Sequence, residues 1–155
     1  MSYHGIRATW GDSWFTEYGE KWLDVFSERA HQQWKDSLLP GTLMLLYQGS
    51  GYGGSRCITA AAMVQGRFVH NEKREIPGVE EWREHWCWCL PVITIAPRRT
   101  VTPVPLERIR EIIEPEKAGR PHQARFPRQG EVWRPISAQL YETLMAEMLP
   151  DRTSE

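Results

Sequence analysis

The sequence lacks several features that would define its class at once. It holds only three cysteines among 155 residues, an odd number that makes no complete disulfide framework and fits a reducing compartment. No stretch approaches the roughly 18 uninterrupted apolar residues of a membrane span, and no secretion signal is apparent. The charges of acidic and basic residues nearly cancel, with 19 Lys and Arg against 20 Asp and Glu. Attraction of nucleic acid would therefore need a local stripe of basic residues. We therefore expect a cytoplasmic protein.

The motifs of common enzyme chemistries are also missing. The chain has no Gly-x-Ser-x-Gly elbow, no His-Glu-x-x-His pair and no Asp-Gly metal loop. The glycine-rich run 49–55 lacks a Gly-Lys-Ser/Thr ending and leads into an expected strand, so it does not fit a phosphate-binding P-loop. We expect neither catalytic residues nor a cofactor.

Tryptophan, by contrast, is abundant, with eight residues. This side chain serves either as a large core filler or as a flat wall for a ligand. Trp22 and Trp34 belong to a four-residue repeat within 18–37, which predicts an amphipathic helix with both indoles in the core. The Leu-Pro-Gly run at 39–41 would end this helix.

The rest of the chain alternates short apolar segments with turns. Three of these segments have strand character: 42–48, 57–69 and 86–96. The first two would form a hairpin, and Pro91 would mark a bulge or an edge in the third.

Two further helices complete the expected fold. One covers 106–113, after a Pro-Val-Pro run, and the last begins after Ser137, which is placed as its N-cap. The order of elements predicts one α+β domain over 1–150, a small twisted β-barrel with flanking helices, and a frayed tail at 151–155.

Several local patterns along the chain together resemble one known family. They are an aromatic-rich first strand, the helix closed by Leu-Pro-Gly, a strand ending Leu46-Tyr47, the Pro-Val-Pro-Leu run at 103–106, and Arg-Gln-Gly at 128–130 followed by 133–137 and a helix. Their order over nearly the whole chain resembles the EVE family of PUA-like domains, which are related to YTH readers. The resemblance implies a PUA-like barrel and a non-enzymatic reader of DNA or RNA. Such a reader holds a flipped modified base, above all methylated or hydroxymethylated cytosine, in an aromatic pocket.

The aromatic residues at expected turns are the candidates for that base pocket. Trp10 and Trp14 flank a turn that carries Ser13, Tyr52 lies at the tip of the glycine-rich loop, and Trp133 precedes the final helix. Stacking on such rings returns about 1 to 3 kcal/mol per base and offsets the cost of flipping. Structural alternatives stay open: Trp133 could seal the helix end, and Tyr52 could simply be exposed.

Basic residues gather in the loop before the final helix. We expect Arg125, Arg128, Gln129 and Arg134 to contact the nucleic-acid backbone, because phosphate contacts position a strand without reading it. The alternative is an ordinary solvated surface. A partner nuclease or another effector protein could act beside such a reader.

A zinc site is an alternative on the third strand. His85, Cys87 and Cys89 share one face there, and Cys57 or His70 could add a fourth ligand. The spacing is not the usual Cys-x-x-Cys knuckle, and buried free cysteines commonly pack as small apolar groups, so we expect no metal.

Two other functions compete with the reader. An ASCH-like hydrolase acting on a modified nucleoside or RNA would need an acid–base pair, and its Gly-x-Lys-x-x-Glu signature is not evident. A protein-interaction domain, with tryptophans on a partner surface, is the third choice.

Overall fold

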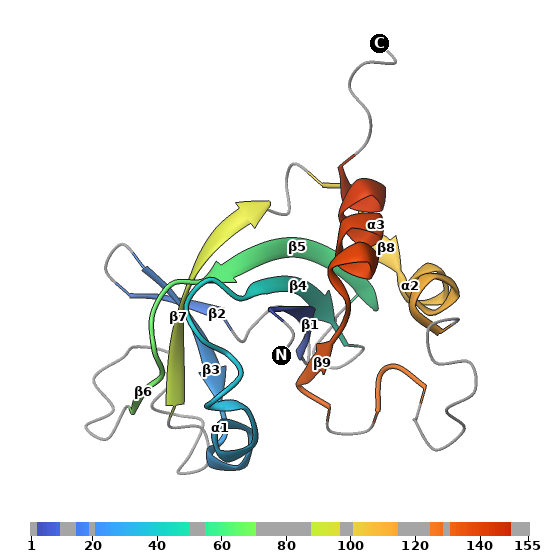
Figure 1. Cartoon of the computed structure of the whole chain (residues 1–155). Coiled ribbons are helices and arrows are strands. Elements are labelled where there is room, and N and C mark those ends of the chain that lie inside the picture. Colours follow the sequence, from blue (N-terminus) through green and yellow to red (C-terminus); the bar gives the residue numbers. More distant parts are fainter. Residues whose placement is uncertain are drawn as a thin grey trace.

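The computed structural model shows an α+β architecture in which one curled mixed sheet carries three helices (Figure 1). The structure describes residues 3–9, 15–18, 21–49, 55–70, 88–96, 101–114, 125–128 and 131–149. The strands are β1 (His4–Thr9), β2 (Phe15–Tyr18), β3 (Lys21–Phe26), β4 (Leu43–Gln48), β5 (Cys57–Val64), β6 (Val69–His70), β7 (Trp88–Ala96), β8 (Val104–Pro105) and β9 (Trp133–Pro135). The helices are α1 (Glu28–Trp34), α2 (Leu106–Ile113) and α3 (Ala138–Met148). None of these described helices combines the length and apolar character that a membrane span needs.

The sheet runs in the order β2-β3-β7-β5-β4-β1-β9, with β6 added to β7 and β8 added to β5. Neighbouring strands are antiparallel except β1 and β4, which are parallel with Thr9 opposite Gln48. The expected hairpin is confirmed as β4 and β5, with a register shift after Leu46. The parallel pair places the carboxyl ends of β1 and β4 at the same edge of the sheet.

The helix expected over 18–37 is wrong for most of its length. Residues Phe15–Tyr18 and Lys21–Phe26 are strands, and only Glu28–Trp34 is helical. Apolar residues four apart also share one face of a strand, so the pattern fitted both structures. Residues 21–26 form a strand because β3 pairs with β7. Helix α1 begins after Ser27, whose hydroxyl accepts the N–H of Ala30 at 3.1 Å.

Alternating side chains along the strands form one core on each face of the sheet. The outer core lies under α2 and α3 and includes Ile6, Leu45 and Leu144. The inner core lies on the concave face with α1 and includes Phe26 and Met44. In Figure 1, α1 lies below the arch of the sheet, while α2 and α3 lie beside its other face.

Both carboxyl-terminal helices are confirmed. Helix α2 follows Pro105, and α3 follows Ser137, whose hydroxyl accepts the N–H of Leu140 at 3.2 Å. Ile136 and Tyr141, before and after that cap, are both buried in the outer core.

Pro91 lies within the sheet, at neither an edge nor a bulge. Its strand β7 pairs with β3 on one side, where Pro91 is opposite Leu23. On the other side its carbonyl oxygen accepts the N–H of Gln65, which follows the end of β5. The N–H and C=O groups of a strand residue point to the same side. Proline has no N–H, and the side to which that N–H would point faces the break between β5 and β6. The expected continuous strand 57–69 is interrupted at this break.

Candidate functional site

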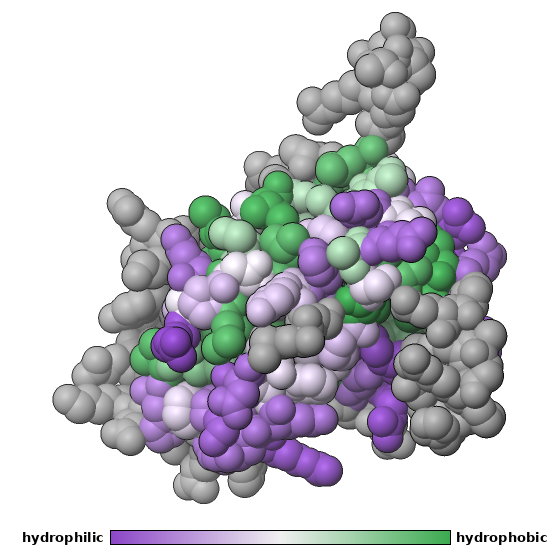
Figure 2. Space-filling model, in the orientation of Figure 1, coloured by the Kyte–Doolittle hydropathy of each residue, from purple (hydrophilic) through white to green (hydrophobic). Residues whose placement is uncertain are grey.

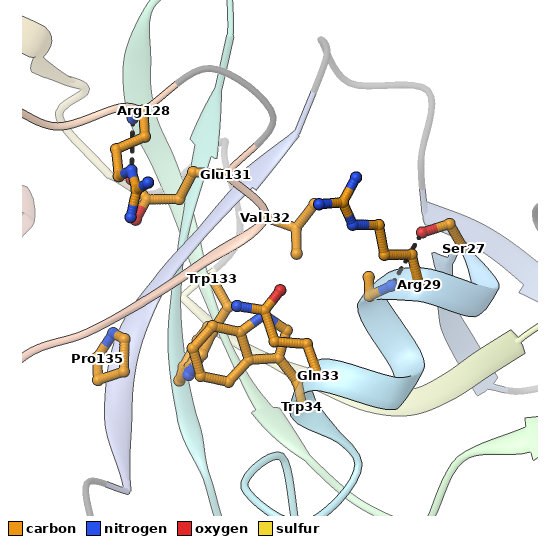
Figure 3. Close-up of a pocket in the computed structure, with 10 residues that line it drawn as sticks. Ser27, Arg29, Gln33, Trp34, Arg128, Glu131, Val132, Trp133 and Pro135 are labelled. Atoms are coloured by element: carbon orange, nitrogen blue, oxygen red, sulfur yellow. Dashed lines mark hydrogen bonds between the residues drawn. The ribbon is translucent and has the colours of Figure 1, made fainter. Parts of the chain in front are cut away.

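A cavity of about 390 Å³ opens between α1 and the segment that leads into β9 (Figure 3). Helix α1 and its cap supply Ser27, Arg29, Ala30, Gln33 and Trp34; the β9 side supplies Arg128, Glu131, Val132, Trp133 and Pro135. This volume falls within the roughly 300 to 1,000 Å³ of small-molecule sites.

Helix α1 presents two pairs of residues to the cavity, each spaced by one turn. Ala30 is buried in the inner core, and Trp34 is half-buried beside that core. Arg29 and Gln33 are exposed. Residues four apart lie one above the other on a helix, so each pair forms a row along the cavity wall. Figure 2 shows hydrophilic residues gathered over α1, at the lower centre of the view.

Trp133 borders the cavity from β9 and belongs to the inner core at the same time. Its side chain is only 2% exposed. A Cβ atom on Gly5 would overlap Cζ2 of Trp133 and would lie 2.7 Å from the carbonyl oxygen of Arg134. Glycine is therefore needed at position 5 because the indole and the β9 backbone approach it closely.

Glu131 and Arg134 form a largely buried ion pair at the cavity rim. The Nε of Arg134 donates to Oε2 at 2.7 Å and Nη2 donates to Oε1 at 2.8 Å, a fork-like contact. Burial raises the pKa of Glu131 to about 7, although the backbone N–H and the charge of Arg128 oppose the rise. The contact with Arg134 acts in the same direction as Arg128, because both favour the carboxylate.

The arginines expected at a nucleic-acid backbone lie in three different environments. Arg125 is exposed and paired with Glu114 at 3.1 Å. Arg134 is 9% exposed and paired with Glu131, so its guanidinium already has a partner inside the protein, and its expected backbone contact stays a prediction. Arg128 lines the cavity. Gln129, which is also expected to contact the nucleic-acid backbone, lies outside the described residues.

Most of the expected base pocket also lies outside the described residues. This holds for Trp10, Ser13, Trp14 and Tyr52.

The strands that precede these segments, β1 and β4, end close together. The end of β1, Thr9, is opposite the end of β4, Gln48. At the same edge the backbone N–H of Ala8 donates to the carbonyl oxygen of Val132 at 3.0 Å, just before β9 begins. The chain therefore leaves the sheet after β1, leaves it after β4 and returns into β9 at one edge.

Only some of the residues considered as zinc ligands lie within the described part of the chain. Cys89 is fully buried in β7 and Cys57 is partly buried in β5, while His85 and Cys87 lie outside the described residues. Within the part that the structure describes, no group of three or more metal-binding side chains occurs.

An aromatic cluster fixes α1 to the sheet. The imidazole of His31 stacks on the indole of Trp88, with ring centroids 3.5 Å apart and an angle of 2° between the planes. Phe68 meets the same imidazole edge-on at 5.0 Å, and the indole N–H of Trp88 donates to Glu28. Burial lowers the pKa of His31.

Sequence reasoning missed Arg29, Gln33 and Trp34 as site residues. Trp34 is assigned to the core by its spacing, whereas it also lines the cavity. The available signal was Ser27, a good N-cap, because a helix that starts there places Arg29 and Gln33 one turn apart on an exposed face.

The chain is similar in fold to a solved structure over nearly its whole length. The NMR structure of Rpa0253 from Rhodopseudomonas palustris, a Northeast structural genomics consortium target, is similar with a TM-score of 0.54 at 10% sequence identity. The match covers 95% of this chain and 92% of that chain. At this identity it shows a shared fold and carries no statement about activity. No protein-family model and no curated protein matches the chain.

Proposed function

We propose that this protein is a non-enzymatic reader of DNA or RNA that holds one flipped modified base, with methylated or hydroxymethylated cytosine as the leading ligand. The main support is the convergence of three chain segments at one sheet edge. Thr9 and Gln48 end parallel strands side by side, and Val132 returns to the sheet against Ala8. The segments that begin at Thr9 and Gln48 carry Trp10, Ser13, Trp14 and Tyr52 in sequence.

The cavity between α1 and β9 adds a second support. Trp34 lines it with a half-buried indole, and Trp133 closes it from the inner core. Accessible indole faces bind bases of any sequence by stacking. Exposed Arg29 and Arg128 stand at the same cavity, where a nucleic-acid strand would bring phosphate charge. A base would thus find aromatic surface and cationic groups together.

We also propose that the domain is of the EVE type, within the PUA-like folds. The patterns that resemble an EVE-type, PUA-like domain fall after α1, at the start of α2, and from β9 into α3. These are the boundaries of elements around the curled sheet, which is where a family pattern of turns and caps would be expected.

A binding screen tests the proposal. Fluorescence anisotropy would compare short labelled DNA and RNA oligonucleotides, single- and double-stranded, that differ only in one central cytosine: unmodified, 5-methyl or 5-hydroxymethyl. We expect one modified form to bind more tightly than its unmodified counterpart. Equal affinity for all members of every set would contradict a reader function.

A matched pair of variants ties that preference to the cavity. Gln33→Trp places a bulky ring on an exposed residue that lines the cavity, and Gln32→Trp makes the same change on its exposed neighbour, which does not line it. We expect Gln33→Trp to lose the preference and Gln32→Trp to retain it. The same loss in both variants would place the base elsewhere.

One observation favours the ASCH-like hydrolase as a second candidate. Glu131 borders the cavity with a pKa raised to about 7, a value suited to a general acid or base at neutral pH. Its oxygens already accept from Arg134 and from the N–H of Arg128, which is why we rank it second. Mass spectrometry of modified nucleosides after incubation would detect turnover, and a hydrolase of this kind would lose it on Glu131→Gln.

A further inference from the structure

Two arginines face the cavity from different elements of the fold. Arg29 comes from α1 and Arg128 from the segment before β9 (Figure 3). Figure 3 shows Arg29 extending from the helix toward Val132, on the opposite side. Both arginines are exposed, and within the described residues neither guanidinium makes an ion pair or a hydrogen bond.

The charges around the cavity do not cancel. Among the described residues that line it, the acidic one is Glu131, which already makes the fork-like contact with Arg134. No carboxylate among the described residues forms an ion pair with the guanidinium of Arg29 or Arg128. Two such like charges at one cavity favour an anionic ligand.

Other arginines are already committed to carboxylates. Arg7 pairs with Asp24, and Arg125 pairs with Glu114. Such pairs fix the direction of each guanidinium inside the protein or on its surface. Within the part of the chain that the structure describes, no such pair holds Arg29 or Arg128. A planar guanidinium fork matches the oxygens of a phosphate group.

We infer that Arg29 and Arg128 form a two-sided clamp for a phosphate group, namely the phosphodiester next to the base held in the cavity. This step rests on the proposed function. The clamp would position the strand, while the half-buried indole of Trp34 would receive the base. In this clamp, Arg128 before β9 and Arg29 of α1 contact the nucleic-acid backbone.

Small probes test the clamp without any oligonucleotide. The arginine Nε–Hε signals in NMR spectra would be followed during titration with inorganic phosphate, deoxycytidine 5′-monophosphate or deoxycytidine. We expect phosphate and the monophosphate to shift the signals of Arg29 and Arg128. The monophosphate should bind about tenfold more tightly than the nucleoside, as suits a charge-assisted contact.

Three single variants share one charge change: Arg29→Gln, Arg128→Gln and the control Arg67→Gln. Arg67 is exposed and does not line the cavity. We expect the first two to remove most of the advantage of the monophosphate and the control to retain it. Matching thermal unfolding curves would show that all three fold.

Salt dependence of oligonucleotide binding gives an independent readout. Each clamp variant should weaken modified and unmodified oligonucleotides alike and should lower the slope of log affinity against log salt by about one unit more than Arg67→Gln. Equal slopes in all three variants, or phosphate that shifts neither Arg29 nor Arg128, would overturn the clamp even if a modified base is preferred. Conversely, phosphate bound at both arginines without any preference among oligonucleotides would uphold the clamp and reject the reader function.

Discussion

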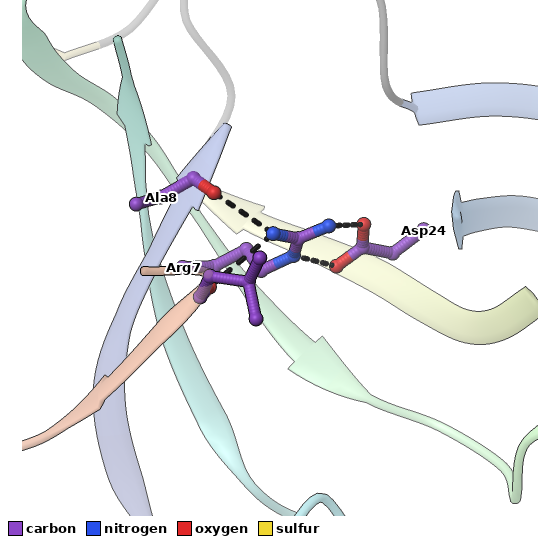
Figure 4. A network of polar contacts seen from close by, with 4 residues as sticks. Arg7, Ala8 and Asp24 are labelled. Atoms are coloured by element: carbon purple, nitrogen blue, oxygen red, sulfur yellow. Dashed lines mark hydrogen bonds and ion pairs between the residues drawn. The ribbon is translucent and has the colours of Figure 1, made fainter. Parts of the chain in front are cut away.

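Arg7 of β1 and Asp24 of β3 form a two-pronged ion pair across the inside of the sheet (Figure 4). Nε donates to Oδ2 at 2.8 Å and Nη2 to Oδ1 at 2.9 Å, while Nη1 donates to the carbonyl oxygens of Ala8 and Val132. Strands β4, β5 and β7 lie between β1 and β3 in the sheet order. The two side chains meet only because the sheet curls, so this pair joins its two sides next to the segment that lines the cavity.

Removing one partner of this pair should strongly destabilise the fold. Arg7 is 2% exposed and Asp24 is fully buried, so Asp24→Ala leaves a buried positive charge without its partner. We expect the free energy of unfolding to fall by about 3 to 5 kcal/mol, measured by urea denaturation. Glu111→Ala, which removes an exposed partner of Arg108, is the control and should change stability far less. Similar small effects in both variants would mean that the pair does not hold the curled sheet.

Gly5→Ala should force the indole of Trp133 out of its place. The added Cβ would overlap Cζ2 of Trp133 and the carbonyl oxygen of Arg134, and such overpacking costs about 1 to 3 kcal/mol. Urea denaturation of a double-mutant cycle would check the cause. In a Trp133→Leu background the cost of Gly5→Ala should be smaller, though not zero, because the carbonyl oxygen remains. Equal costs in both backgrounds would exclude the indole as the reason.

Mild acid should weaken the fold through His31. Burial against Trp88 lowers its pKa below the ordinary 6.5. The nearby ionisable groups act in both directions: Glu28 and Asp36 raise the pKa, while Lys35 and His70 lower it. The folded protein binds the proton less readily than the unfolded chain. The stabilising contribution is therefore complete above pH 6.5 and is lost as the pH falls toward the lower folded-state pKa.

His31→Phe isolates this effect, because phenylalanine keeps a flat ring beside Trp88 without a titrating group. Urea denaturation of both proteins on either side of pH 6.5 would give the comparison. We expect the native protein to lose more stability than the variant as the pH falls. Parallel losses would show that folding does not lower the pKa of His31.

The sequence predicted the carboxyl-terminal half of the fold better than the amino-terminal half. Ser137 and the proline before Leu106 are local signals that mark where α3 and α2 begin. Trp22 and Phe26 instead repeat at a spacing that suits a strand or a helix. Pairing with Val92 and Trp88 of β7, far along the chain, decides between them.

The candidate site was less predictable because it depends on contacts between distant segments. Arg134 and Arg128 carry the same charge and lie six positions apart, yet only Arg134 is buried and paired with Glu131. Likewise, the space that Gly5 leaves for Trp133 appears only once β1 and β9 pair. Residue type and spacing cannot show which side chain a folded sheet will enclose.

Trp34 and Trp133 should respond differently to the same truncation, because one is half-buried at the cavity and the other is almost fully enclosed. Trp34→Ala should weaken binding of the preferred oligonucleotide by about 1 to 3 kcal/mol through lost stacking. Trp133→Ala should instead lower the free energy of unfolding by about 3 to 5 kcal/mol, since it empties a place in the inner core. Anisotropy titrations and urea denaturation on the same two variants separate the effects. A large loss of stability on Trp34→Ala with unchanged affinity would make this residue a core filler and leave the cavity without its proposed stacking wall.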